Sequence, residues 1–390
     1  MHVLIIPSAY PTEDAPLRGT FFKEQALALK EGNLKVGVIY SETRRVTGIN
    51  ANTLKKFHFQ VNDSLENGVR TVRLQGWNIL MMRNSLGINL WVKQTLKLFK
   101  LYIKKYGLPD LIHVHIGLYG GVAAKKIKEI YNIPYVITEH SSNVLNGTLN
   151  EYNKKLLKEA YDNADYLISV GEKLKTKMAD YTDNEICVIP NIVNTDRFII
   201  NKSKKEKNKF RFVSVSFLND NKNVDLTIKA FNKAFKGKEE YELYIAGDGA
   251  AREKLENLVK ELNLDKQVKF VGSVSRNELP KFYNEGDCFV LPSKYETFGV
   301  VYIEALSCGL PIITTKCGGP EDFFTDDLGY MIEVGDEEAL CKAMKDVVVN
   351  KDNFNNEAMS KYIKNKFSKV IISQEIKNTY NMVLENKRRV

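Results

Sequence analysis

The sequence predicts an α/β protein that contains two parallel β-sheets, each covered by helices on both faces. Short apolar stretches typical of buried strands alternate with amphipathic stretches typical of helices along the whole chain. This alternation occurs in two runs, separated by the charged segment 201–209. The chain of 390 residues is long enough for two domains, and its 44% hydrophobic and 27% charged content is ordinary for a globular protein. Strands that alternate with helices favour parallel sheets with both faces covered.

The expected elements follow the chain in order. Strands of the first run are expected at residues 2–6, 34–40, 67–73, 110–114, 134–138, 165–170 and 185–189. Strands of the second run are expected at residues 210–217, 242–246, 268–271, 287–291, 311–315 and 329–333. Amphipathic helices are expected at residues 21–31, 120–131, 223–235 and 276–285, and Ser275 with Glu278 forms a capping box before the last of them. Residues 351–388 also favour a helix.

These runs predict two Rossmann-like domains. The first comprises residues 1–195 together with a C-terminal helix at about 372–390, and the second comprises residues 196–371. In open parallel sheets, ligands bind beside the carboxyl ends of the strands. If the two domains face each other, a ligand would bind in the cleft between these two sheet edges.

Glu296 and Glu304 mark the strongest candidate site. Residues 287–291 favour a buried strand, and apolar residues at helical spacing follow from Phe298 until Gly309 stops the helix. Glu304 therefore lies inside an apolar helix, where an ionised group is costly unless another group donates to it. The free N–H groups at the start of this helix favour an anion. Amides for an anion and carboxylates for hydroxyls describe a site for a nucleotide diphosphate-sugar.

Several other classes of protein are disfavoured. No apolar run approaches the ~20 residues of a membrane-spanning helix, and the first residues predict a strand rather than a signal peptide. The five cysteines lack CxxC spacing, which favours reduced thiols in a cytoplasmic protein. Gly247-Asp248-Gly249 lacks the GxGxxG spacing of a dinucleotide site. No Asp-x-Asp triplet and no plausible zinc set occur, so we expect neither a metal nor another cofactor.

Positive charge is concentrated in the first half of the chain. The net charge is +9, and residues 81–105 hold six basic side chains and no acidic one. An amphipathic helix here, with Trp91 on its apolar face, could lie on an anionic membrane surface. The alternative is a helix packed on the core with its lysines in solvent. No nucleic-acid motif accompanies the charge, so nucleic acid is not an expected partner.

Several short motifs occur in order along the chain. They are Pro7-Ser8-Ala9-Tyr10-Pro11 with Gly19-Thr20-Phe21, Asp110-Leu111-Ile112-His113-Val114-His115, Thr138-Glu139-His140, Val188-Ile189-Pro190-Asn191, Ala246-Gly247-Asp248-Gly249, the pair Glu296 and Glu304, and Cys317-Gly318-Gly319-Pro320-Glu321. In this order they resemble the motifs of glycosyltransferase family 4, a family of retaining enzymes with the GT-B fold, and the spacing of Glu296 and Glu304 resembles its EX7E signature.

The resemblance implies a role for each matching residue. Glu304 would bind the ribose hydroxyls, Glu296 the donor sugar near the reacting carbon, and Lys222 the diphosphate. His115 would contact the donor sugar and the reaction centre, whereas His113 is expected to be a core residue. The remaining donor-site residues implied by the family are Phe298, Gly299, Val300, Gly19, Ser216, Gly247 and His140.

The resemblance also implies the reaction. Residues 196–371 would bind the nucleotide-sugar, with a UDP-sugar favoured over a GDP-sugar, and residues 1–195 would bind the acceptor. The sugar would be transferred with retention, without a metal, to a glycan or lipid-linked acceptor of surface polysaccharide or glycolipid biosynthesis. The enzyme would act in the cytoplasm, at the inner face of the plasma membrane if the basic region binds there.

The chain departs from the family pattern at two places. Ser216-Phe217 stands where the family commonly has Gly-Arg, so Lys222 would neutralise the diphosphate alone. Asn194 stands where an aspartate is usual. Two alternatives stay open: an enzyme similar to starch or sucrose synthases that uses a soluble acceptor, and a non-catalytic nucleotide-sugar-binding protein, which the missing arginine favours.

Overall fold

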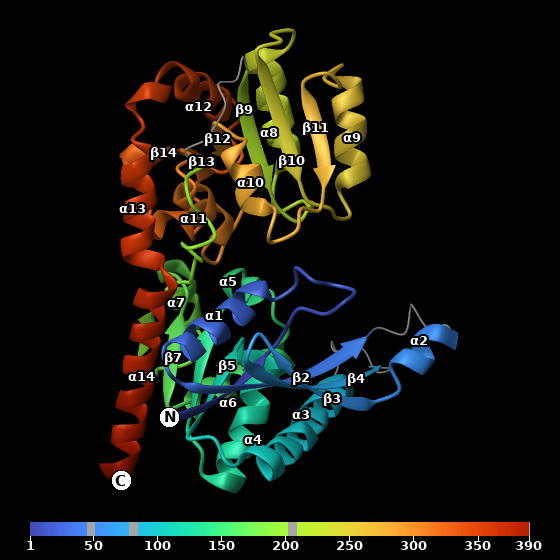
Figure 1. Cartoon of the computed structure of the whole chain (residues 1–390), viewed down its shortest axis with the longest axis vertical. Helices are drawn as coiled ribbons and strands as arrows, with labels where there is room; N and C mark the ends of the chain where they lie inside the picture. The colour runs from blue at the N-terminus through green and yellow to red at the C-terminus, as the bar shows by residue number, and fades with distance from the viewer. Residues whose placement is uncertain (45–50, 78–84, 202–208, 390) are drawn as a thin grey trace. The chain divides into compact units, whose positions relative to one another are not determined.

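The computed structural model describes residues 1–44, 51–77, 85–201 and 209–389. The chain forms two compact units (Figure 1). Unit 1 comprises Met1–Pro190 and Ile372–Val390, and unit 2 comprises Asn191–Ile371. The boundary predicted from the sequence, between residues 195 and 196, lies in the segment that opens unit 2.

Unit 1 contains an eight-stranded sheet in the order β3-β4-β2-β1-β5-β6-β7-β8. All neighbouring strands are parallel except β3, which pairs antiparallel with β4 at the edge. The strands are β1 (His2–Pro7), β2 (Lys35–Arg44), β3 (Gln60–Glu66), β4 (Val69–Trp77), β5 (Leu111–His115), β6 (Tyr135–Glu139), β7 (Tyr166–Ser169) and β8 (Ile186–Val188).

Helices connect these strands and cover the sheet (Figure 1). They are α1 (Thr20–Glu31), α2 (Ala51–Lys56), α3 (Ser85–Tyr106), α4 (Val122–Tyr131), α5 (Ser142–Leu145), α6 (Glu151–Asp162) and α7 (Glu172–Met178), with the short helix η2 (Gly117–Gly121) before α4. The last helix, α14 (Lys369–Arg389), returns to unit 1. There the hydroxyl of Tyr380 lies 2.5 Å from Nδ1 of His113, a contact between residues far apart in the sequence.

Unit 2 contains a six-stranded parallel sheet in the order β11-β10-β9-β12-β13-β14. Its strands are β9 (Phe210–Val215), β10 (Tyr241–Ala246), β11 (Val268–Gly272), β12 (Cys288–Val290), β13 (Ile312–Thr315) and β14 (Gly329–Ile332). Its helices are α8 (Val224–Phe235), α9 (Arg252–Glu261), α10 (Leu279–Asn284), α11 (Val300–Ser307), α12 (Glu337–Val349) and α13 (Asn356–Phe367), with short turns η3 (Pro320–Asp322), η4 (Asp326–Leu328) and η5 (Lys351–Asn353).

The α/β class with two parallel sheets is confirmed. Every strand predicted from the sequence is present within a few residues, and β3 is the strand that the prediction missed. The helix predicted at 276–285 is shorter, Leu279–Asn284, because residues 275–278 form the turn before it. In that turn Ser275 Oγ donates to Glu278 Oε2 at 2.7 Å, so the expected capping pair is present as a side-chain contact.

Each sheet has one point at which the strand order reverses. In unit 1 this point lies between β1 and β5, and in unit 2 it lies between β9 and β12. The helices after the two central strands lead away in opposite directions, which leaves a crevice at the carboxyl edge of the sheet. The loops that follow these four strands are therefore where a ligand is expected.

The apolar face of α3 belongs to the core of unit 1. Trp91 is 2% exposed, and its indole N–H donates to the carbonyl of Ser41 at 3.2 Å. The membrane-surface prediction is therefore wrong in so far as it used this apolar face, because Trp91 and its apolar neighbours already pack against β2 and β4. The lysine face of α3 is exposed, and residues 81–84 of the predicted segment lie outside the described residues.

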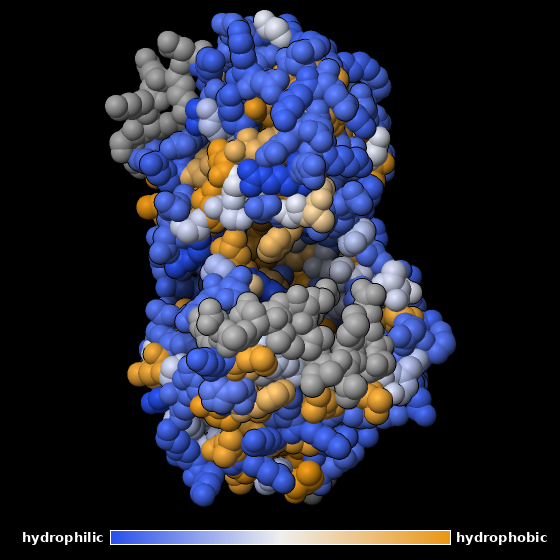
Figure 2. Space-filling model, turned by 90° about the vertical axis from the view of Figure 1, so that its right-hand side faces the viewer, coloured by the Kyte–Doolittle hydropathy of each residue, from blue (hydrophilic) through white to orange (hydrophobic). Residues whose placement is uncertain are grey.

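Along the described parts of the chain, no helix is both long and apolar enough to span a membrane. On the face shown in Figure 2, hydrophilic side chains cover most of the described surface, and hydrophobic ones form separate patches.

Candidate active site

Lys222 and Glu296 form an ion pair at the reversal point of unit 2. Lys222 lies in the loop after β9, and Glu296 lies in the loop after β12. The ammonium group donates to Oε1 of Glu296 at 2.6 Å, and Ser293 Oγ donates to the same oxygen at 2.8 Å. The two side chains are 18% and 11% exposed. The lysine therefore orients the carboxylate, and both side chains keep a small part of their surface exposed.

Asn221 ties these two loops together. Its side chain donates to the carbonyl of Tyr295 at 3.0 Å and accepts from the amide of Tyr295 at 3.1 Å. Its own carbonyl accepts from the amide of Lys294 at 2.8 Å. Three hydrogen bonds on one residue hold the positions of Lys222 and Glu296 relative to each other.

The start of α11 offers a backbone anion site. Phe298, Gly299 and Val300 precede or open this helix, where amides have no carbonyl partner from a preceding turn. Gly299 has φ 89°, a conformation that favours glycine. The chain of Gly319 passes so close that a Cβ there would lie 2.4 Å from the backbone of Phe298. The sequence thus places two glycines where the backbone must turn and where two loops must touch.

Ser216 and Gly247 lie side by side at the carboxyl ends of β9 and β10. A Cβ on Gly247, whose φ is 139°, would lie 1.9 Å from the carbonyl oxygen of Ser216. The Oγ of Ser216 is buried and has no hydrogen-bond partner among the described residues. Phe217, at the position where the family resemblance led us to expect an arginine, is 62% exposed and uncharged.

Glu304 is buried in α11 and is held by two donors. Its side chain is 1% exposed and pairs with Nη1 of Arg276, and Tyr283 donates to its second oxygen at 3.2 Å. Burial, and then the charge of Glu304, raise the pKa of Tyr283 well above its usual value, so the phenol stays a donor. The sequence predicted that Glu304 would need such donors but did not identify them. Arg276 is the functional candidate that sequence reasoning missed, because no motif marks it.

The predicted residues of unit 1 gather at the reversal point of that sheet. His115 ends β5, and its carbonyl accepts from the amide of Ser8, which follows β1, at 3.2 Å. Nδ1 of His115 lies 3.1 Å from Nε2 of His140, which follows β6. The ring of Phe22 packs against both imidazoles, with centroids 4.7 Å from His115 and 5.0 Å from His140.

His115 is more enclosed than the sequence suggested. We expected it to contact a donor sugar, but it is 0% exposed, and His140 is 9% exposed. Burial lowers the pKa of His140 to about 3 and holds the pKa of His115 well below its usual value, so both rings are neutral near pH 7. Nε2 of His115 and Nδ1 of His140 are buried without hydrogen-bond partners among the described residues.

His113 is a core residue, as expected. It is 0% exposed, and both of its ring nitrogens are bonded: Nδ1 contacts the Tyr380 hydroxyl, and Nε2 lies 2.7 Å from Thr138 Oγ1. Gly19 has φ 72° at the start of α1, and a Cβ there would lie 2.6 Å from the carbonyl oxygen of Ala9. The glycine therefore lets the loop after β1 fold back on itself beside His115 and His140.

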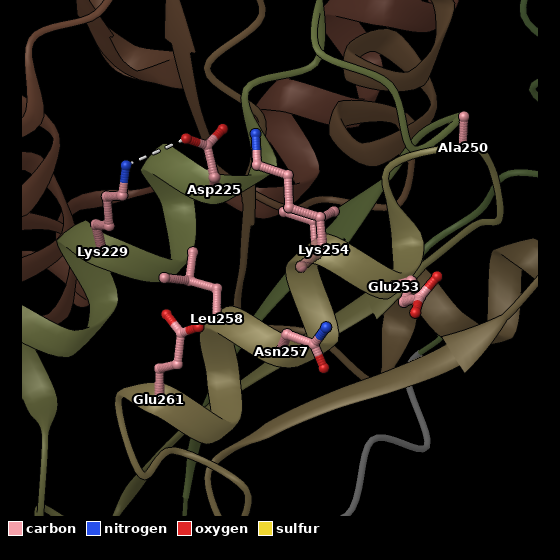
Figure 3. A pocket seen from close by; sticks show the side chains of 9 residues that line it. Asp225, Lys229, Ala250, Glu253, Lys254, Asn257, Leu258 and Glu261 are labelled. Carbon is pink, nitrogen blue, oxygen red and sulfur yellow. Dashed lines mark hydrogen bonds and ion pairs between the residues drawn. The ribbon is translucent and has the colours of Figure 1, made fainter.

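A separate groove of about 560 Å³ lies between α8 and α9 of unit 2 (Figure 3). Its lining is mostly charged and polar but includes Ala250, Leu255 and Leu258. Asp225 and Lys229 form an ion pair of 3.3 Å along one wall. None of the predicted site residues lines this groove. In the described ranges, including this groove, no three His, Cys, Asp or Glu side chains cluster as a metal-ligand set.

Solved structures resemble this arrangement over the whole chain. A sucrose-phosphate synthase of Thermosynechococcus elongatus superposes with a TM-score of 0.81 at 20% identity, covering 99% of this chain and 100% of that one. HepE of Anabaena, solved in complex with UDP, has a TM-score of 0.74 at 18% identity and covers 98% and 100% of the two chains. The two Rossmann-like units therefore define a GT-B fold of the glycosyltransferase type.

Sequence comparison leads to the family. Residues 19–197 match Glycosyltransferase Family 4, and residues 195–367 match Glycosyl transferases group 1. The chain belongs to the family 4 glycosyltransferases. One relative is an uncharacterized glycosyltransferase of Methanocaldococcus jannaschii, 27% identical over 76% of this chain and 81% of its own length. Another is the putative teichuronic acid biosynthesis glycosyltransferase TuaC of Bacillus subtilis, 26% identical over 88% of each chain.

Proposed function

We propose that this glycosyltransferase moves a sugar, with retention of configuration, from a nucleotide diphosphate-sugar to a glycan or lipid-linked acceptor. The observation that carries the proposal is the ion pair of Lys222 and Glu296 at the reversal point of unit 2, in the loops that lead to the start of α11. The first amides of a helix have no carbonyl partner within the helix. A cation and amides suit a diphosphate, and the carboxylate suits sugar hydroxyls.

The donor is proposed to be a UDP-sugar, with a GDP-sugar as the alternative. HepE, which shares the fold, was solved with UDP, and this supports the class of nucleotide. In our proposal, Glu304 accepts hydrogen bonds from the ribose, while Phe298, Gly299 and Val300 donate amides to the phosphates. Ser216 and Gly247 let the donor approach the strand ends closely, because one has a small side chain and the other has none.

The proposed chemistry uses charge that the chain itself supplies. As the bond to the sugar breaks, negative charge grows on the leaving phosphate, and preorganised donors at that position lower the barrier. Lys222 and the amides at α11 would stabilise this charge without a metal. The acceptor hydroxyl would attack the sugar carbon from the same face from which the leaving group departs. A phosphate oxygen of the leaving group would take the proton of that hydroxyl.

His115 and His140 are proposed to contact the donor sugar from unit 1. Both rings are neutral near pH 7, so each presents one donor and one acceptor nitrogen. Because His115 is fully buried, this contact requires side chains around it, such as Phe22, to rearrange when substrate binds.

The acceptor is proposed to belong to surface polysaccharide or glycolipid biosynthesis, on the cytoplasmic side of the membrane. The relationship to TuaC supports a cell-surface polymer. Any membrane contact would be electrostatic, through the lysines of α3, because the apolar face of that helix is buried. Replacing Lys97, Lys100 and Lys104 with glutamine should reduce binding to anionic vesicles, and unchanged binding would refute the contact.

A second candidate uses a soluble acceptor, and the likeness to a sucrose-phosphate synthase favours it. Turnover with soluble sugars or sugar phosphates and no vesicle binding would support this candidate. Tight donor binding with neither transfer nor slow donor hydrolysis would instead indicate a non-catalytic binding protein. This alternative is tested because Phe217 supplies no positive charge for the diphosphate.

The first experiment is a thermal shift panel with UDP, GDP, ADP and their common sugar conjugates, in EDTA. A ligand at about 100 times its Kd adds roughly 2.7 kcal/mol of apparent stability, which raises the melting temperature detectably. A shift with one nucleotide class would support the donor site and its independence of metal. If no compound shifts the melting temperature with or without Mg²⁺, the donor proposal is wrong.

A further inference from the structure

Arg276 and Glu304 form a further ion pair in unit 2, and no sequence motif predicted it. Arg276 lies in the connection between β11 and α10, and Glu304 lies in the second turn of α11. Nη1 of the arginine contacts Oε1 of the glutamate, and the guanidinium carbon lies 4.8 Å from the ring centroid of Phe198. The arginine is thus fixed by a carboxylate and by an aromatic ring.

The burial of the two partners differs. The side chain of Glu304 is 1% exposed, whereas that of Arg276 is 18% exposed. A carboxylate buried this deeply stays ionised only if charged or polar donors compensate for its lost hydration. The guanidinium and the Tyr283 hydroxyl supply those donors, one for each carboxylate oxygen.

The orientation of Glu304 therefore depends on residues outside α11. Tyr283 lies on α10 and Arg276 lies just before that helix, so the same short segment holds both oxygens. A guanidinium is planar and rigid, and it orients a carboxylate better than an ammonium does. We propose that Arg276 is the positioning residue of Glu304, which it keeps ionised and aimed so that the carboxylate accepts hydrogen bonds from the ribose hydroxyls of a ribonucleoside diphosphate.

This inference rests on the proposed function, and it adds a prediction about specificity. If the carboxylate is ionised and oriented, the 2′-hydroxyl of the nucleoside donates to a charged acceptor. Such a hydrogen bond changes affinity by about tenfold to a hundredfold. Without Arg276 the buried carboxylate takes up a proton or turns away, and the 2′-hydroxyl loses its preferred partner.

The test compares UDP with 2′-deoxy-UDP by calorimetry, and GDP with 2′-deoxy-GDP in the same way. We expect the wild-type chain to prefer the ribonucleotide by about tenfold or more, since the hydrogen bond involves a charged group. In Arg276→Gln this preference should fall to less than about threefold, and Arg276→Lys should restore only part of it.

Arg211→Gln is the matched control. Arg211 donates to Glu242 at 2.7 Å, and its side chain is 17% exposed, close to the value for Arg276. It lies at the start of β9, at the opposite end of the strand from the site loops. This variant should lose stability in the same way but keep the preference for the ribonucleotide.

The outcomes separate the inference from the function on which it rests. If the wild-type chain binds none of the four nucleotides, the proposed function fails. If Glu304→Gln abolishes the preference but Arg276→Gln leaves it intact, only the positioning role is overturned. If Arg276→Gln weakens both nucleotides of a pair equally, the arginine binds another part of the donor, and the inference is also overturned.

A double variant covers the case in which Arg276→Gln fails to fold. Arg276→Gln with Glu304→Gln removes both charges, so no buried charge is left without a partner. If Arg276 acts through Glu304, the double variant should prefer the ribonucleotide no more than Glu304→Gln alone does. A further loss of preference in the double variant would show an independent role for the arginine and contradict the inference.

Discussion

Nδ1 of His115 and Nε2 of His140 lie 3.1 Å apart, so the tautomers of the two rings are coupled. Because both rings are neutral near pH 7, one of these nitrogens donates and the other accepts. The two outer nitrogens, Nε2 of His115 and Nδ1 of His140, must then be one acceptor and one donor. Reversing the shared hydrogen bond therefore requires both rings to change tautomer together, which exchanges the donor and the acceptor at the two outer nitrogens.

The first prediction concerns pH and stability. Burial holds the pKa of His140 at about 3, below the ordinary value of 6.5, so the unfolded chain binds more protons than the folded one between these values. The free energy of unfolding should therefore fall as the pH drops below 6.5. Each such histidine contributes about 1.4 kcal/mol per pH unit. Denaturant titrations of wild type and His140→Gln at several pH values should show a smaller slope of unfolding free energy against pH in the variant. Equal slopes for wild type and His140→Gln would contradict a lowered pKa of the buried His140.

The second prediction concerns Lys222. Lys222→Ala removes the ammonium that faces the proposed leaving phosphate, and we expect kcat/KM to fall about 100-fold or more. Lys229→Ala is the control, because Lys229 lies on the next helix and its side chain is 45% exposed in a pair with Asp225. Steady-state kinetics with a nucleotide-sugar distinguishes a lysine that binds the diphosphate from one that has no part in the reaction. An unchanged kcat/KM for Lys222→Ala would exclude the diphosphate role.

The third prediction concerns Glu304. Glu304→Gln keeps the shape of the side chain but removes the charge, so affinity for the nucleoside diphosphate should fall about tenfold to a hundredfold. The melting temperature should stay near that of wild type, since the amide oxygen can accept from Arg276 and the amide nitrogen can donate to the Tyr283 hydroxyl. Glu333→Gln, at an exposed pair with Lys316, should bind as wild type does. Retained affinity in Glu304→Gln would rule out the ribose role.

The fourth prediction concerns Gly319. The methyl group of Gly319→Ala would lie 2.4 Å from the backbone of Phe298, so the loop before α11 must move. Donor binding should weaken strongly while the far-ultraviolet circular dichroism is unchanged. Gly32→Ala is the control at a glycine outside the site, where the nearest atom to a Cβ is 3.3 Å away, a tight contact rather than an overlap. Full donor affinity in Gly319→Ala would show that this loop is not part of the site.

The fifth prediction concerns the returning helix. Tyr380→Phe leaves Nδ1 of buried His113 without its partner, which should cost about 1–3 kcal/mol of unfolding free energy. Tyr152→Phe, at a tyrosine that is 42% exposed, should change stability little. Chemical denaturation of both variants gives the comparison. Equal stability of the two would mean that the buried contact adds nothing to unit 1.

Much of the fold could be predicted because the buried strands of parallel sheets are apolar and regularly spaced. β3 was missed because Gln60–Glu66 is a polar edge strand whose pattern has no apolar alternation. The apolar face of α3 was ambiguous for a different reason. Periodicity shows that Trp91 shares a face with other apolar residues, but only the tertiary structure shows that β2 and β4 cover that face.

The site was predicted unevenly. Glu296, Glu304 and Lys222 could be proposed from the sequence because they stand at fixed places relative to strands and helix starts, and their roles stay predictions. Their partners were not found, since Arg276 is one arginine among many, and its pairing depends on how α10 packs beside α11. The burial of His115 could not be predicted either, because it depends on Phe22 from a distant part of the sequence.

The contact between Tyr380 and His113 has a consequence for synthesis of the chain. The ribosome makes all of Asn191–Ile371 before it makes the helix segment that carries Tyr380. A nascent polypeptide can therefore complete the second sheet and its helices while His113 still lacks its partner. Domains commonly finish folding in the order in which they are translated. Here unit 2 can finish folding before unit 1.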